Sequence, residues 1–155
     1  SEGAYELFNG SDAGLTYYLH TPRIYVEKHL GRVRRMISER IEVDMPRQKF
    51  WRHLLSGAAG FVIGGTGVVK AGDWIELKIS EPATVRAVVE VLVEGRGLGL
   101  RIAELTDALL FVELEGKGDK FHVGYWFSVY DEAQAKALET SAKTAFRRIH
   151  ESLPA

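Results

Sequence analysis

The most informative stretch for the fold is residues 32–103, RVRRMISERIEVDMPRQKFWRHLLSGAAGFVIGGTGVVKAGDWIELKISEPATVRAVVEVLVEGRGLGLRIA. In this stretch a basic cluster and a Ser/Gly-rich turn lead into alternating strands. Segments 75–79 and 85–94 both alternate apolar with other residues, which is the period of a strand with one buried face. Turn residues separate these segments, so we expect an antiparallel sheet that closes or curls into a barrel. One face of the second segment carries Val85, Ala87, Val89, Val91 and Val93.

Toward the C-terminus, the pattern predicts a short strand over 98–102 and then a hairpin of 109–115 and 120–130, joined by residues 116–119. Asp131 with Gln134 resembles a capping box at the start of a long helix. The predicted fold class is α+β and rich in strands: a six- to seven-stranded antiparallel, barrel-like sheet with a long C-terminal helix. Apolar residues recur along that helix at Leu138, Ala142, Ala145, Ile149 and Leu153.

Toward the N-terminus, residues 1–31 differ from the rest, and we interpret them as an extension or partial unit in front of a domain at 32–155. Residues 15–20 alternate as in a strand. Thr21 and Pro22 are typical of a helix start, so the sequence predicts a helix from about Pro22 to Met36, with a hairpin as the alternative. Residues 50–55 are compatible with either a helical turn or a strand.

Composition excludes several classes of protein. The chain has 155 residues, 46% hydrophobic and 26% charged, as in an ordinary globular domain. It has no cysteine, which removes disulfides, thiol catalysis and Cys-based metal sites. The net charge of −1 gives no reason to expect a nucleic-acid partner. The N-terminus lacks a signal-peptide pattern and no apolar run is long enough to span a membrane, so the expected location is the cytoplasm.

Motifs of known catalytic chemistry do not occur. The five histidines show no metal-ligand spacing, and no G-x-S-x-G motif or other nucleophile–base set can be assembled. We therefore expect no catalytic residue, no metal and no cofactor, and we favour a binding or regulatory protein over an enzyme.

Two clusters are candidates for binding an anionic ligand. Arg34, Arg35 and Arg40 carry planar guanidinium groups that bind phosphates and stack on flat bases, although they could equally form a solvated face with nearby glutamates. The turn from Ser56 to Gly60 could offer backbone N–H groups and a hydroxyl to a phosphate, or simply connect two strands. Aromatic residues could line a pocket or fill the core: Trp51, Trp74, Tyr125, Trp126 and Phe127.

The order of these motifs resembles the PilZ domain, a six-stranded β-barrel family whose usual ligand is cyclic di-GMP. The resemblance implies that Arg34, Arg35 and Arg40 grip phosphates and stack on guanine, and that Ser56 and Gly60 form the opposite wall of a nucleotide-sensing site. The PilZ motif D/N-x-S-x-x-G also occurs at Asn9–Gly14, ahead of the arginines. The matching segments are 34–44, 54–60, 71–77 and 97–105.

A second family remains an alternative. Residues 41–54, a strand that leads through Pro46 toward a helix, and residues 131–153 look like the two helical parts of the SRPBCC or START-like helix-grip family. That resemblance implies an internal cavity for an apolar ligand, with Tyr125 or Phe127 near it. Under either interpretation the partner is a small molecule, and the last helix could also serve binding of a protein partner or self-association.

Overall fold

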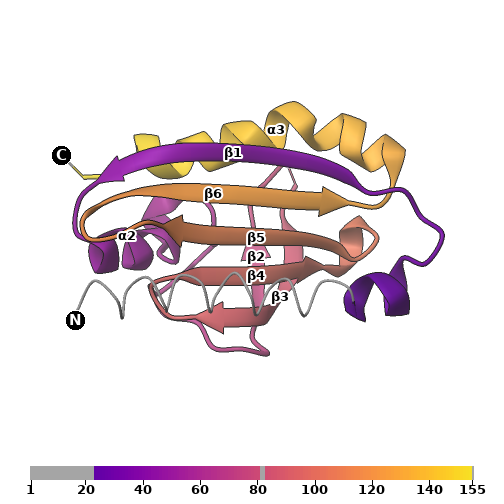
Figure 1. The fold of residues 1–155 in the computed structure, drawn as a ribbon, viewed down its shortest axis with the longest axis horizontal. Helices are drawn as coiled ribbons and strands as arrows, with labels where there is room; N and C mark the ends of the chain where they lie inside the picture. Colours follow the sequence, from indigo (N-terminus) through magenta and orange to yellow (C-terminus); the bar gives the residue numbers. More distant parts are fainter. Residues whose placement is uncertain (1–22, 81–82, 155) are drawn as a thin grey trace.

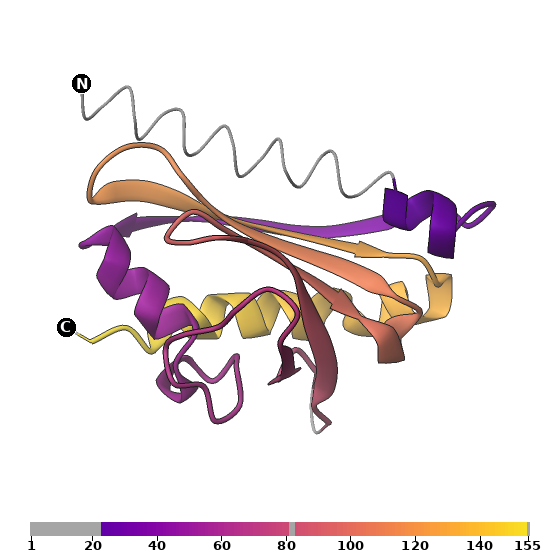
Figure 2. The same ribbon diagram turned by 90° about the horizontal axis from the view of Figure 1, so that it is seen from below.

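The computed structural model describes residues 23–80 and 83–154, and its core is one antiparallel sheet with a long helix across one face (Figures 1 and 2). The six strands have the order β1-β6-β5-β4-β3-β2. The strands are β1 (Arg35–Asp44), β2 (Trp74–Leu77), β3 (Val85–Val93), β4 (Gly97–Ile102), β5 (Ala108–Glu115) and β6 (Lys120–Val129). The helices are α2 (Arg47–Leu54), the 3₁₀ turns η1 (Gly57–Ala59) and η2 (Ala103–Leu105), and α3 (Glu132–Glu151).

The sheet is open, which corrects the expected barrel. β1 and β2 are its two edges, and they do not pair with each other. The physical reason is that α3 and α2 cover the apolar face of the sheet, so the sheet need not curl onto itself to bury it (Figure 2). The α+β class, the antiparallel sheet and the long C-terminal helix are confirmed.

The register of β1 and β6 sets the inner face that α3 covers. The two strands pair along their full length, from Arg35 opposite Val129 to Asp44 opposite Lys120. Ile37 therefore lies beside Phe127, and both are buried in the core. Because side chains alternate along a strand, the neighbours of these residues point to the outer face.

The start and the buried stripe of α3 follow the sequence prediction. Asp131 caps the helix, its Oδ1 accepting the backbone N–H of Gln134 at 2.8 Å. Leu153 lies beyond the helix end and is partly buried. The buried residues of α3 are Ala135, Leu138, Ala142, Ala145, Phe146 and Ile149.

The helix predicted from Pro22 to Met36 is too long. Helical backbone in the described part of this segment covers residues 23–28, and β1 already begins at Arg35. Gly31 has a positive φ of 84°, a left-handed conformation that ends a helix readily. Of the segment 50–55, for which helix and strand were both open, residues 50–54 belong to the helix α2 and Leu55 is its C-cap. The predicted strand at 15–20, the helix start at Thr21 and Pro22 and the motif at Asn9–Gly14 lie outside the described residues.

β3 departs from the predicted alternation. Its pairing with β4 shifts between Val89 and Val91, so Val89 opposes Leu100 whereas Val91 opposes Gly99. This β-bulge adds one residue to β3. Val89 faces the interior with Leu100, and Val91 lies on the outer face, so the expected single valine face is wrong beyond the bulge.

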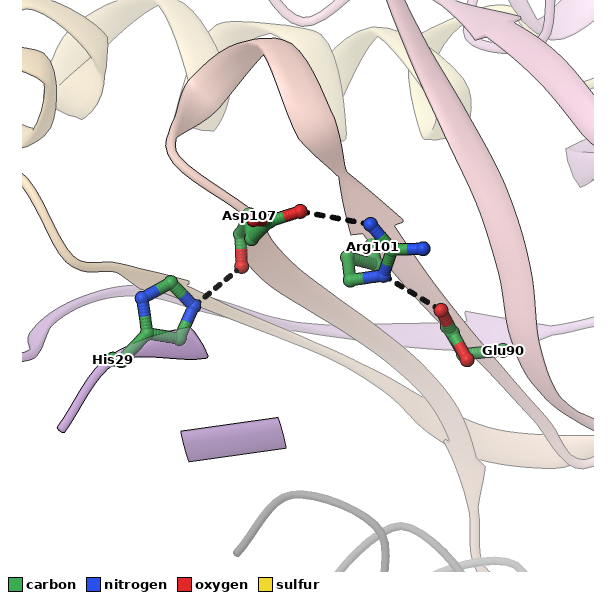
Figure 3. A network of polar contacts seen from close by, with 4 residues as sticks. All are labelled: His29, Glu90, Arg101 and Asp107. Carbon is green, nitrogen blue, oxygen red and sulfur yellow. Dashed lines mark hydrogen bonds and ion pairs between the residues drawn. The ribbon is translucent and has the colours of Figure 1, made fainter. Parts of the chain in front are cut away.

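A chain of polar contacts holds the segment before β1 against the outer face (Figure 3). The buried ring of His29 stacks on Tyr130, with centroids 3.6 Å apart, and its Nε2 lies 2.8 Å from the Asp107 carbonyl oxygen. The Asp107 carboxylate accepts a hydrogen bond from Arg101, which also donates to Glu90 at 2.7 Å. The division into an extension at 1–31 and a domain at 32–155 stays a prediction. None of the helices in the described residues is long and apolar enough to span a membrane.

Candidate functional site

A buried polar pair interrupts the apolar layer between the sheet and α3. The Tyr125 hydroxyl, from β6, and Nε2 of His150, from the last turn of α3, share a hydrogen bond of 2.7 Å. Tyr125 is fully buried, whereas His150 is only partly buried. Phe146 stacks on the Tyr125 ring at 4.6 Å, and the Phe50 ring lies 5.2 Å from His150. The pair is therefore a local hydrogen-bonding group with aromatic walls.

A second histidine extends this polar region toward the surface. Nε2 of His53, from α2, lies 3.0 Å from both the Ile149 carbonyl oxygen and the Ser152 hydroxyl. These contacts join α2 to the end of α3. The polar groups thus run from the interior at Tyr125 to the exposed end of the last helix at Ser152.

Burial keeps the pair uncharged at neutral pH. Desolvation and, to a smaller extent, the nearby His53 together lower the pKa of His150 to about 4. Desolvation also raises the pKa of the Tyr125 hydroxyl well above its ordinary value. The pair can therefore offer one neutral donor and acceptor set to a ligand, and it does not supply a fixed charge.

Arg47 holds α2 in place beside this region. Its guanidinium donates to the carbonyl oxygens of Leu114 at 3.0 Å and Gly116 at 2.8 Å, and it lies over the Phe121 ring at 4.6 Å. A buried arginine in this position provides hydrogen-bond donors for the backbone carbonyl groups at the end of the β5–β6 hairpin. Arg47 was not among the arginines predicted from the sequence to bind a ligand, which lie before and within β1. The available signal was its position one residue after Pro46, at the start of a helix.

The arginines singled out from the sequence do not share a surface. Arg35 donates to Glu132 of α3 at 3.1 Å, whereas Arg40 donates to Glu115 of β5 at 2.8 Å. The two are five residues apart on one strand, so they point to opposite faces of the sheet. Arg34 is exposed just before β1.

Ser56 and Gly60 lie on the side of the sheet that α2 and α3 cover. The Ser56 hydroxyl donates to the His53 carbonyl oxygen at 2.8 Å, and the Gly60 carbonyl accepts from Arg148 of α3 at 3.3 Å. The sheet separates them from Arg40. The structure does not bring the five residues together, and a ligand-binding role for any of them stays a prediction.

The five aromatic residues divide between core and surface. Trp51, Tyr125 and Phe127 are buried in the main core, Trp126 is partly buried on the outer face, and Trp74 is 51% exposed. Trp126 lies 6.1 Å from Phe111, with the two rings stacked. The expectation of core packing therefore holds for three of them.

Three hollows of the described surface lie away from Tyr125 and His150. They have volumes of about 310, 330 and 440 Å³ and lie beside Arg35 and Ala135, beside Trp74, and beside Arg32 and Tyr130. The layer around the polar pair is instead filled by side chains, several of them aromatic. No group of three or more His, Cys, Asp or Glu in the described residues is arranged to hold a metal ion.

The sequence matches no family model and no curated protein. Solved structures do match. CalU16 from Micromonospora echinospora is 14% identical with a TM-score of 0.62, over 77% of this chain and 76% of CalU16. The Aha1 dimer structure from Colwellia psychrerythraea gives 15% identity and a TM-score of 0.57, over 77% of this chain and 96% of that one. DynU16, a putative protein in the dynemicin biosynthetic locus, gives 11% identity and a TM-score of 0.60 over 75% of this chain, which spans only 46% of DynU16.

These matches establish the fold: it is the helix-grip fold of SRPBCC and START-like proteins, a six-stranded antiparallel sheet gripped by a long C-terminal helix. The PilZ resemblance is wrong. A PilZ domain is a closed barrel, whereas this sheet is open and its first strand is followed by α2. The expectation of cyclic di-GMP sensing rested on that resemblance and falls with it. Identities this low carry the fold and nothing about function.

Proposed function

We propose that this protein binds a small, mainly apolar ligand between the sheet and α3, with one polar group of the ligand held by Tyr125 and His150. The observation that carries the proposal is their 2.7 Å hydrogen bond inside an otherwise apolar layer. A buried polar group costs free energy unless it is paired, and an apolar pair of the same shape would fill the space without that cost. A polar pair is useful where a ligand must be oriented.

The position of the pair supports a route for the ligand. Tyr125 is fully buried, while His150 on the last turn of α3 is partly exposed beside α2. A ligand that enters between α2 and the end of α3 meets His150 first and Tyr125 next. The His53 contacts with Ile149 and Ser152 close this route and must break for the ligand to pass.

The aromatic filling defines the kind of ligand. Phe146 stacks on Tyr125 and Phe50 lies beside His150, and both phenylalanines are fully buried. A ligand therefore has to displace aromatic side chains. A flat or flexible apolar molecule suits such a site best. The neutral state of the pair favours a hydroxyl or carbonyl group on the ligand over a charged one.

The proposal is tested by titrating the ¹⁵N-labelled protein with 1-decanol and following backbone amide shifts. We expect saturable shifts at Tyr125, Phe127 and His150. Tyr125→Phe removes the hydroxyl without changing the packed ring and should weaken binding roughly fivefold to tenfold, in line with the loss of about one hydrogen bond. Decane, which has no polar group, should bind wild type and this variant equally.

Matched substitutions serve as controls. Tyr130→Phe changes a buried tyrosine of the separate cluster with Ile24 and Leu109, so the affinity for decanol should stay the same. Replacing both Arg35 and Arg40 by alanine should also leave it unchanged, because their hydrogen bonds go to Glu132 and Glu115 and involve neither Tyr125 nor His150. Shifts that avoid the interior, or equal weakening by Tyr125→Phe and Tyr130→Phe, would contradict the proposal.

A further inference from the structure

β2 is one of the two edges of the open sheet, and part of its backbone has no partner among the described residues. Val89 of β3 donates to the Asp73 carbonyl oxygen at 2.9 Å, and Ile75 opposes Ala87. In an antiparallel ladder, backbone groups of alternate residues face alternate sides. The backbone groups of Trp74 and Glu76 therefore face away from β3, toward the open side.

A loop segment covers only one end of that open side. The Ile63 N–H donates to the Glu76 carbonyl oxygen, and the Lys78 N–H donates to the Phe61 carbonyl oxygen, each at 2.9 Å. The N–H and carbonyl groups of Trp74 and the N–H of Glu76 have no hydrogen-bond partner among the described residues. An exposed strand edge of this kind is a template for another extended chain.

A hollow with exposed apolar side chains in its wall lies directly beside the free groups. It has a volume of about 330 Å³, and its wall includes Ile63, Val68 and Trp74, which are 43%, 69% and 51% exposed. Large exposed apolar side chains gathered around a hollow are typical of an interaction site. The charged residues in this wall are Asp73 and Glu76, both acidic.

Trp74 is held in position without being buried. The Arg86 guanidinium, from β3, lies 4.9 Å from the centre of the indole ring on the outer face. A cation–π contact of this kind restrains an exposed ring. The ring is thus available to a partner at little further cost in side-chain entropy.

From these features we propose that the free edge of β2 binds an extended peptide segment of another protein. The segment adds a short strand to the sheet through the backbone groups of Trp74 and Glu76. It places one large apolar side chain in the hollow and carries lysine or arginine beside it, facing Asp73 and Glu76. This surface lies at the far edge of the sheet from β1 and is independent of the interior ligand layer.

The test is a ¹⁵N-NMR titration of the full chain with the blocked peptide acetyl-Lys-Thr-Val-Phe-Val-Thr-Lys-amide. We expect saturable binding at roughly millimolar or tighter affinity, with the largest amide shifts at Ile63, Trp74 and Glu76. The same peptide with N-methyl groups on alternate residues loses the backbone donors and should bind at least roughly tenfold more weakly. A peptide with glutamate in place of both lysines should also bind more weakly.

Two variants test the protein side. Trp74→Ala should weaken the lysine peptide roughly tenfold, because an exposed tryptophan in an interaction site contributes strongly. Glu76→Lys should weaken it roughly threefold, as expected for one exposed charge pair. Glu139→Lys, which reverses a charge on the exposed side of α3, is the matched control and should leave the affinity unchanged.

Three results would overturn the proposal: no saturable response, equal affinity for the N-methylated peptide, or shifts that map to α3 or β1. A fourth is a concentration-dependent dimer in sedimentation experiments with the same amide shifts in the absence of peptide. That outcome would assign the edge to a second copy of this chain.

Discussion

The two edges of the sheet are covered to very different degrees. At the β1 edge, ten-residue strands pair in continuous register and α3 lies across them (Figure 1). At the β2 edge, the strand has four residues, and loop segment 56–73 reaches it through one isolated bridge, Val62 opposite Leu77. The stabilising apolar packing lies beneath α3, whereas the short β2 edge combines free backbone groups with exposed apolar side chains, a combination that suits binding.

The largest effect is expected beneath α3. Phe146→Ala removes a fully buried ring that stacks on Tyr125, and it should lower the free energy of unfolding by about 3–5 kcal/mol. Chemical denaturation monitored by tryptophan fluorescence measures this. A loss below about 1 kcal/mol would mean that the α3 layer is not the main source of stability.

The next effect lies in the loop that leads to β2. A Cβ on Gly65 would overlap the Leu55 carbonyl oxygen, a backbone atom that cannot easily move. Gly65→Ala should therefore destabilise the protein by about 2–4 kcal/mol. Gly64→Ala is the matched control: its Cβ meets no atom within 4 Å, and only its φ of 65° opposes the change, at a cost of about 1 kcal/mol. Equal effects for the two variants would contradict close packing at this site.

Acidification should lower the free energy of unfolding, in part through the buried histidines. Burial lowers the pKa of His29 and contributes most to lowering that of His150 to about 4. As the pH falls, these histidines are therefore protonated in the unfolded chain before they are protonated in the folded protein. Their contribution to the free energy of unfolding is present at pH 7, begins to fall below the ordinary histidine pKa of 6.5, and for His150 is lost as pH drops toward 4. His150→Asn should flatten this part of the pH dependence.

Glu113 acts in the opposite sense over part of the same range. Burial, and then the neighbouring Glu115, raises its pKa to about 7, so the folded state holds a proton that the unfolded chain releases. This glutamate favours folding as the pH falls from about 7 to its ordinary value of 4.5. Glu113→Gln should therefore make the loss of stability on acidification steeper. Urea unfolding of the His150→Asn and Glu113→Gln variants at several pH values measures the contribution of each residue separately. An unchanged profile in both variants would contradict these assignments.

The smallest effect is expected at the exposed edge. Trp74 is 51% exposed and its main contact is with Arg86, so Trp74→Ala should change the free energy of unfolding by less than about 1 kcal/mol. The measurement is the same denaturation, with Trp51 and Trp126 as remaining fluorescent probes. A larger loss would show that the β2 edge contributes to the free energy of unfolding, and it would contradict the difference proposed between the two edges of the sheet.

Local patterns predicted most individual elements correctly. The hairpin of β5 and β6, the strand β4, and the capped helix α3 all follow from alternation, turn residues and helical spacing. The family resemblance failed because it matched motifs in order along the chain. Leu54 stands where the PilZ turn has Asp or Asn, and this position belongs to the buried face of α2.

The candidate site could not be found in the same way. Tyr125 and His150 are 25 residues apart on different elements, and each taken alone is an ordinary strand or helix residue. His53 is 96 residues before Ile149, and no local period connects them. Only the docking of α3 on the sheet brings these groups within hydrogen-bond distance.

The sequence by itself determined the strands, the turns and the C-terminal helix, because alternation, capping and glycine placement act over a few neighbouring residues. The tertiary structure alone decided that the sheet stays open, that a bulge turns Val91 outward, and that α3 covers one face. It also decided which polar groups meet in the interior and which backbone groups of β2 stay free. These outcomes depend on packing and pairing between distant segments, and local residue patterns do not encode them.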